Sequence, residues 1–347
     1  MLISEFDYEL PAALIAQEPL DRRESSRMLV VNRAANDFRD EHFENFPAFL
    51  REGDVLVLNN TRVFPARLVG RRENFTGKIE LFLVRETATA IWETLARPAR
   101  RLQIGTRLIF GDGELRAQIL EKQPNGRLIV EFESNGDFDE MLERIGQTPL
   151  PPYLEREEKP SARDRERYQT VFARERGAIA APTAGLHFTP AILREITAKG
   201  VQIVEITLHV GYGTFEPVRV ADLSEHTVAA EQIEIGAKTS AVLTQAKIEK
   251  RRIVAVGTTT TRALESATNE NGAIESGKRA AELTITPGYQ FRTVDTLLTN
   301  FHLPQSSLLV LVSTFAGHDL TMRAYHRAVA AKYRFYSYGD CMLIVNS

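Results

Sequence analysis

Three histidines lie in loops whose composition suits proton transfer. His187 lies in PTAGLHF, His209 in HVGYGTF and His302 in TNFHLP. A histidine side chain titrates near neutral pH, so each of the three could act as a general acid or base. They lack the HxxxH and HExxH spacings of zinc sites, and Cys341 is the only cysteine in the chain. The pattern therefore predicts acid–base or hydrogen-bonding histidines and no metal centre.

Two segments rich in glycine and threonine are candidates for ligand binding. GTTTTR holds Thr258, Thr259 and Arg262 and precedes an expected helix, whose N-terminus attracts anions. Threonines there are also common helix caps, but four in a row exceed what capping requires, so we predict ligand contact. HVGYGTF supplies Gly211 and Gly213 either to a nucleotide-binding loop or to a tight turn, and its spacing does not separate the two.

The hydrophobic pattern indicates which elements position these loops. DVLVL at 54–58 reads as a buried strand, and after residue 177 strand-like and helix-like segments alternate, which indicates parallel strands with crossover helices. Between 63 and 135, six short alternating segments are separated by turns such as Asn125-Gly126, which is typical of an antiparallel barrel or sandwich. We therefore predict an α/β main domain, barrel-like and discontinuous (1–62 and 150–347), with an inserted small antiparallel β-barrel domain (63–149).

The loops that follow the predicted α/β strands are all polar or glycine-rich. Ligands of parallel α/β folds bind at the carboxyl ends of the strands, so these loops should meet at one rim. The convergence predicts an active site there. The loops read NNTRVFPAR, PTAGLHF, HVGYGTFEPV, GTTTTR and TNFHLPQSS.

Charge and composition bound the partners and the location of the protein. The net charge of −3 argues against an extensive nucleic-acid-binding surface but permits a local basic patch. Such a patch, or simply a solvated face, is formed in the inserted segment by Arg67, Arg71, Arg97, Arg100 and Arg101. No apolar run is long enough for a membrane helix, and the acidic N-terminal segment does not read as a secretory signal. We expect a cytoplasmic protein without a membrane partner.

Motifs along nearly the whole chain resemble the S-adenosylmethionine:tRNA ribosyltransferase-isomerase family of queuosine biosynthesis. Several of them are long, and they occur in the family's order. One departure is Ala229, which stands where many members of the family have a second histidine after His226. The matching stretches are FDYELPAALIAQEPLDRRESSRMLV, GDVLVLNNTRVFPARLVG, GKIEL, RYQTVFA, AAPTAGLHFT, TLHVGYGTFEPV, AVGTTTTRALES, PGYQF, LLTNFHLPQSSLLVLVSTFAG and YRFYSYGDCMLI.

The resemblance implies an activity and a set of partners. The ribosyl part of S-adenosylmethionine would be transferred to 7-aminomethyl-7-deazaguanine at the tRNA wobble position, giving epoxyqueuosine and releasing adenine and methionine. S-adenosylmethionine would be consumed as a substrate, without a further cofactor, by a monomeric enzyme that binds the precursor-bearing tRNA. The alternatives are an S-adenosylmethionine-dependent tRNA methyltransferase, a metal-dependent hydrolase and a tRNA-binding module without catalysis.

The family's chemistry requires a base at the carbon next to the sulfonium, an acid for adenine and a base for the acceptor amine. We expect His187, His209 and His302 in these roles, supported by Glu231 or Asp340. The basic patch defined above would contact tRNA. The predicted substrate-binding residues are Thr61, Arg62, Thr183, Gly185, Gly211, Gly213, Thr214, Thr258, Thr259, Arg262 and Asn300.

Overall fold

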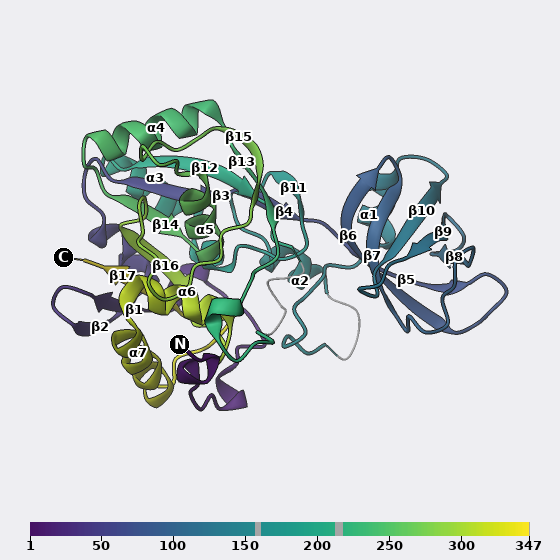
Figure 1. Cartoon of the computed structure of the whole chain (residues 1–347), viewed down its shortest axis with the longest axis horizontal. Helices are drawn as coiled ribbons and strands as arrows, with labels where there is room; N and C mark the ends of the chain where they lie inside the picture. The colour runs from purple at the N-terminus through teal and green to yellow at the C-terminus, as the bar shows by residue number, and fades with distance from the viewer. Residues whose placement is uncertain (157–160, 212–217, 347) are drawn as a thin grey trace.

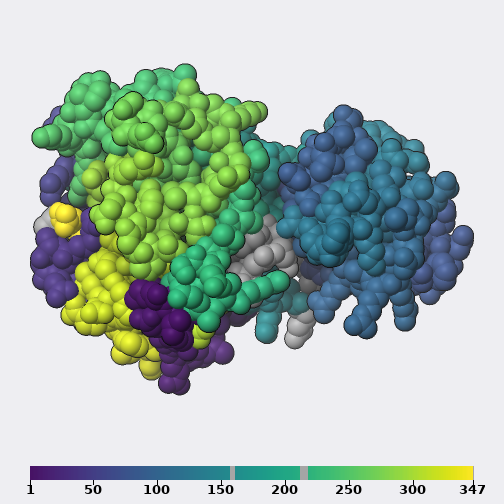
Figure 2. All heavy atoms as spheres, in the orientation of Figure 1, coloured from purple at the N-terminus to yellow at the C-terminus, as the bar shows by residue number. Residues whose placement is uncertain are grey.

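The chain forms a large α/β lobe and a smaller β lobe that projects to one side of it (Figures 1 and 2). The computed structural model describes residues 1–156, 161–211 and 218–346. Both termini lie on the large lobe (Figure 1). No helix in these described ranges is both long and apolar enough to cross a membrane.

A nine-stranded mixed sheet forms the centre of the large lobe. Its four central strands, β12, β3, β14 and β16, run parallel, whereas β17 pairs antiparallel with β16 and parallel with β1. β3, β14 and β16 are buried along their whole length, as strands covered on both faces must be. In sheet order the strands are β15 (Gly277–Ala281), β13 (Glu231–Ile235), β12 (Gln202–Leu208), β3 (Val55–Asn59), β14 (Ile253–Val256), β16 (Thr296–Asn300), β17 (Cys341–Val345), β1 (Arg27–Asn32) and β2 (Asp37–His42).

Helices cover both faces of this sheet because successive strand residues point to opposite sides. Val55 and Val57 of β3 belong to one hydrophobic core, and Leu56 and Leu58 belong to the other. The first core is closed by α4 (Ala237–Ile248), α5 (Thr258–Ala267), α6 (Ser307–Ala316) and α7 (His318–Ala330), and the second by α3 (Pro190–Ala198) and the 3-10 helix η4 (Phe43–Phe49).

The small lobe is a closed, fully antiparallel six-stranded barrel. Alternate residues fill its interior, among them Leu68, Leu81 and Leu108, and α1 (Phe138–Ile145) packs against it through Met141 and Leu142. The lobe lies in sequence between β4 (Thr61–Val63) and β11 (Glu175–Ala178), which pair with each other; α2 (Ala162–Arg167) precedes β11. Around the ring the strands are β10 (Leu128–Ser134), β7 (Ile91–Arg97), β6 (Lys78–Ala88), β5 (Arg67–Arg72), β8 (Arg107–Phe110) and β9 (Leu115–Lys122).

The structure confirms the α/β class and the antiparallel β-barrel. The main sheet differs in one respect from a barrel-like arrangement, because it ends in the edge strands β15 and β2. The reason is that β13 and β17 run antiparallel to the central strands and interrupt the strand–helix repeat that closes a parallel barrel. The exact domain boundaries, 1–62 with 150–347 and 63–149, stay a prediction.

Candidate functional site

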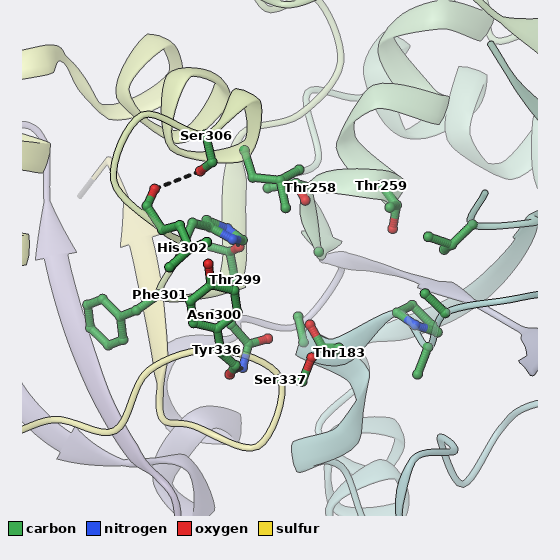
Figure 3. Close-up of a pocket in the computed structure, with 18 of the residues that line it drawn as sticks. Thr183, Thr258, Thr259, Thr299, Asn300, Phe301, His302, Ser306, Tyr336 and Ser337 are labelled. Atoms are coloured by element: carbon green, nitrogen blue, oxygen red, sulfur yellow. Dashed lines mark hydrogen bonds between the residues drawn. The ribbon is translucent and has the colours of Figure 1, made fainter. Parts of the chain in front are cut away.

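A cavity of about 470 Å³ opens at the carboxyl ends of β14 and β16. The loops that follow these strands, together with the 3-10 helix η5 (Thr183–His187), form much of its wall. In Figure 3, Thr258 and Thr183 lie across the cavity from His302 and Asn300. Three of the predicted loops, PTAGLHF, GTTTTR and TNFHLPQSS, therefore meet as the parallel strands require, and Val210 of HVGYGTF joins them.

The four threonines of GTTTTR divide into two pairs. Thr260 Oγ1 donates to Val256 O (2.7 Å) and Thr261 Oγ1 to Gly257 O (3.1 Å), so both hydroxyls satisfy backbone carbonyls. Thr258 and Thr259 line the cavity instead. No side chain caps α5 there, and Gly257 takes a positive φ of 94° to start the helix. The first-turn amides and the positive end of the α5 dipole are therefore available to an anionic group.

Asn300, the last residue of β16, presents an acceptor at the cavity wall. Its Nδ2 group donates to Tyr336 O (3.2 Å) and to His187 Nε2 (3.2 Å), which fixes the amide orientation. Its Oδ1 atom is buried and has no hydrogen-bond partner among the described residues. Buried acceptors are rarely left unpaired, so this atom marks a place for a ligand donor.

His302 lies on the same wall in a neutral state. Its Nε2 atom is 2.9 Å from Thr299 Oγ1, and only 9% of the residue is exposed. Burial lowers the pKa of the His302 imidazole to about 3. The ring is therefore unprotonated at neutral pH, and the same burial makes it a weak base in this state.

The cavity wall carries aromatic side chains and, among the described residues, no charged one. The rings of Tyr153 and Tyr336 lie 4.0 Å apart between centroids. Tyr336 holds a φ of 73°, unusual for a bulky residue. Its N–H donates to Phe301 O, and its carbonyl accepts from Gly339 N (2.9 Å). Backbone hydrogen bonds thus hold Tyr336 at the cavity wall in a conformation that is sterically unfavourable for a bulky residue.

A second cavity of about 660 Å³ lies between the two lobes and shares Val210 with the first. The main lobe contributes His209, Gly211 and Glu231 among others, whereas the barrel contributes apolar, acidic and basic side chains. The barrel residues in its wall are Val84, Arg85, Glu86, Trp92, Glu93 and Arg127.

His209 is held at this second cavity by close packing. Its Nδ1 atom is 2.8 Å from Thr61 Oγ1. A Cβ on Gly177 would come within 2.7 Å of the His209 ring, so a glycine is required there. Burial lowers the pKa of His209 below its ordinary value, so its neutral form is favoured.

Arg262 and Glu231 form a buried ion pair instead of offering free charges to a ligand. Arg262 Nη1 is 2.7 Å from Glu231 Oε2, and each side chain is 7% exposed. Arg262 also donates to the carbonyls of Ala229, Ala281 and Leu283, and it lines neither cavity. Glu231 Oε1 accepts from Gly211 N at 3.0 Å. The predicted contact of Arg262 with substrate is therefore not what the geometry shows: Arg262 orients Glu231, and Glu231 anchors the start of the loop after β12.

Four other predicted residues lie outside the first cavity. His187 is 3% exposed, and its Nδ1 atom is 2.9 Å from Ser26 Oγ. Its Nε2 atom contacts the Asn300 amide, so His187 orients Asn300 and does not itself line the cavity. Asp340 is buried and accepts from the backbone N–H groups of Arg27 and Arg334, which is a structural role. Gly185 leaves room for Phe172, since a Cβ there would come within 2.8 Å of that ring. Arg62 is exposed beside the junction with the barrel.

The remaining predicted residues are placed as follows. Gly213 and Thr214 lie outside the described residues. Arg71, Arg97, Arg100 and Arg101 are exposed on the barrel, whereas Arg67 pairs with Glu80 at 2.9 Å. Their contact with tRNA stays a prediction. Within the described ranges, no three His, Cys, Asp or Glu side chains are grouped so that they could hold a metal ion.

Sequence reasoning missed the aromatic wall. Tyr153 lies in TPLPPYL and Tyr336 in YRFYSYGD, neither of which follows a predicted parallel strand. The available signal was the concentration of tyrosines beside Gly339, a glycine whose Cβ would come within 2.5 Å of Arg334 O. A tight turn that presents aromatic residues could have been inferred from it.

Comparisons with known proteins agree with this architecture. The family model described as "Queuosine biosynthesis protein" matches residues 3–344. The S-adenosylmethionine:tRNA ribosyltransferase-isomerase of Syntrophotalea carbinolica is 50% identical over 347 residues, and that of Desulfitobacterium hafniense is 47% identical over 345; each match covers 99% of this chain and all of the relative.

A solved structure extends the similarity to three dimensions. The crystal structure of S-adenosylmethionine tRNA ribosyltransferase from Thermotoga maritima is 35% identical, with a TM-score of 0.56, and the match covers 99% of this chain and all of that one. The shared motifs, the full-length matches and the common fold lead to one assignment. The chain belongs to the S-adenosylmethionine:tRNA ribosyltransferase-isomerase family of queuosine biosynthesis.

Proposed function

We propose that this enzyme transfers and isomerises the ribosyl group of S-adenosylmethionine onto 7-aminomethyl-7-deazaguanine at the tRNA wobble position. The products are epoxyqueuosine in tRNA, free adenine and methionine. The observation that carries the proposal is the meeting of the β14 and β16 loops with η5 around one cavity that has a helix N-terminus, an unpaired amide oxygen and an aromatic wall. S-adenosylmethionine is consumed as a substrate, and the reaction uses no further cofactor.

The methionine part of the donor matches the α5 end of the cavity. Its carboxylate is an anion. The donors available to it are the backbone N–H groups in the first turn of α5 and the hydroxyls of Thr258 and Thr259. The sulfonium is a cation, and the described wall offers it aromatic rings, not a carboxylate. The faces of Tyr153 and Tyr336 attract a cation through their quadrupoles.

The ribose and adenine match the β16 end. Asn300 Oδ1 accepts a hydrogen bond from a ribose hydroxyl or from the adenine amino group. His302 is assigned as the base that takes a proton from the 5′ carbon, because its unprotonated imidazole lines this end of the cavity and the neighbouring sulfonium makes that carbon acidic. Loss of that proton starts the opening of the ribose as adenine departs.

The acceptor base then enters from the interlobe cavity. His209 and the Glu231-anchored Gly211 lie there, and Val210 separates this cavity from the first. A neutral His209 can take the proton that the acceptor amine must lose before it attacks. Methionine leaves as the epoxide closes.

The fate of two labels tests the proposal against methyl transfer. S-adenosylmethionine carrying one label on the ribose and another on the methyl group is incubated with precursor-bearing tRNA. We expect the ribose label on RNA and the methyl label in free methionine, with adenine released in equal amount. Methyl label on RNA together with S-adenosylhomocysteine would refute the proposal and establish a methyltransferase. Prior treatment with a chelator should leave the rate unchanged.

A further inference from the structure

The outer surface of the barrel is charged asymmetrically. β5 lies opposite β10 in the ring. On β5 and its neighbours the outward residues include Arg71, Lys78 and Arg107, whereas β10 presents Glu131 and Glu133. Exposed cations therefore gather around β5, although the chain as a whole is slightly acidic; the opposite side carries both signs, since Glu133 is in register with exposed Arg116 of β9.

Strand register brings the basic residues together across four strands. Arg71 of β5 pairs with Lys78 of β6 and, on its other side, with Ile109 of β8. Arg107 is two residues from Ile109 and so shares its outward face, diagonal to Arg71. On β7, Arg97 pairs with Glu80, two residues from Lys78 on the outward face. We call Arg71, Lys78, Arg97 and Arg107 the barrel basic face.

Few carboxylates neutralise the barrel basic face. Arg71, Arg97 and Arg107 are exposed, and their guanidinium groups make no ion pair or hydrogen bond with any described residue. Glu80 is the carboxylate in their midst, and it already pairs with Lys78 at 2.9 Å and with Arg67 at 2.9 Å. Exposed cations without counter-charges are what a phosphate backbone neutralises.

The barrel basic face is displaced along the strands from the interlobe cavity: Arg97 is four residues from Glu93 of that cavity, about 13 Å at roughly 3.3 Å per residue, and Lys78 lies farther away. Arg85, which lines that cavity, and Lys78 lie on the same strand, β6, seven residues apart. At roughly 3.3 Å per residue, they are about 23 Å apart along the strand. A nucleic acid whose reacting base occupies the cavity would meet these cations with phosphates well removed from that base. Figure 2 shows the barrel as a projecting lobe, free of the main lobe over its outer side.

We propose that the barrel basic face binds the phosphate backbone of the helical stem that flanks the modified loop of the tRNA. This inference rests on the proposed function, because it places the acceptor base in the interlobe cavity. It adds Lys78 and Arg107 to the arginines that the sequence predicted to contact tRNA. It also assigns the contact to the stem of the RNA instead of the loop. Recognition is by charge and shape, since double-stranded RNA is read mostly through its phosphates, its 2′-hydroxyls and its helical shape.

The salt dependence of tRNA binding measures these contacts. Each phosphate contact adds about 0.9 to the slope of log affinity against log salt, so between 50 and 200 mM salt it accounts for about a 3.5-fold loss of affinity. In the triple variant Arg71→Gln, Arg97→Gln, Arg107→Gln, three such contacts are missing. The loss of affinity between 50 and 200 mM salt should therefore be smaller than that of the wild type by a factor of about 40. The matched control is Lys122→Gln, which removes an exposed cation at the end of β9 outside the barrel basic face.

A comparison of two RNA substrates tests the assignment to the stem. We expect Arg71→Gln to raise KM for full-length tRNA and to leave KM unaltered for the same loop on a stem of about two base pairs. Equal effects on both RNAs would overturn the stem assignment. An unchanged salt slope in the triple variant, or an equal change in Lys122→Gln, would overturn the surface itself. Normal tRNA binding by a wild-type enzyme that releases no adenine would refute the proposed function and leave this surface intact.

Discussion

Acidification tests whether His187 and His302 are buried in neutral form. The pKa of each imidazole is lowered to about 3, by burial in both cases and, for His187, also by the neighbouring Arg23 and Arg334. The packing agrees, because His187 Nε2 faces the Asn300 amide N–H, and a protonated ring would set two donors against each other. An unfolded histidine titrates near 6.5.

The sign of the effect follows from these values. The folded pKa lies below the unfolded one, so under pH 6.5 the unfolded chain binds protons that the folded chain does not. Stability is complete above pH 6.5 and is lost progressively as the pH falls toward 3. At pH 5.0 the difference of 1.5 units corresponds to about 2 kcal/mol for each histidine at 1.36 kcal/mol per unit.

Urea unfolding at pH 7.5 and pH 5.0 measures this loss. The change in unfolding free energy between the two pH values is compared for the wild type, His187→Gln and His302→Gln. Each variant should lose about 2 kcal/mol less than the wild type on acidification, whatever its stability at pH 7.5. A loss as large in both variants as in the wild type would refute the argument that these rings are neutral when folded.

Two further predictions concern the cavity wall and the ion pair behind it. Tyr336→Leu should reduce the preference for S-adenosylmethionine over the uncharged thioether S-adenosylhomocysteine by about 2- to 30-fold, the worth of one cation–π contact, whereas Tyr336→Phe should retain it. Equal weakening of both ligands in calorimetric titration would exclude sulfonium recognition by this ring. Arg262→Met should lower the unfolding free energy by about 3–5 kcal/mol because it leaves Glu231 charged and buried. Adding Glu231→Gln removes the unpaired charge and should recover part of the lost unfolding free energy. If the double variant is no more stable than Arg262→Met, the buried charge of Glu231 is not the cause of the loss.

The sequence by itself determined the elements and the rim at which the site would form. Continuous apolar runs such as DVLVL and IVAV predicted the central strands, because only strands covered on both faces lack polar alternation. The alternating segments with Asn125-Gly126 predicted antiparallel barrel strands. Parallel direction then required the loops after these strands to end at one edge, which is why Thr258 and His302 could be assigned to a common cavity.

Only the tertiary structure decided which side chains in those loops face the cavity. Thr258 and Thr260 are the same residue type two positions apart, yet one lines the cavity and the other bonds to the backbone. Arg262 turns inward because Glu231 and three carbonyls, all distant in sequence, lie within its reach. Tyr336 reaches the wall through a loop held by Phe301 and Gly339. Local spacing encodes the periodicity of an element, whereas the direction of a side chain depends on partners that only long-range packing brings near.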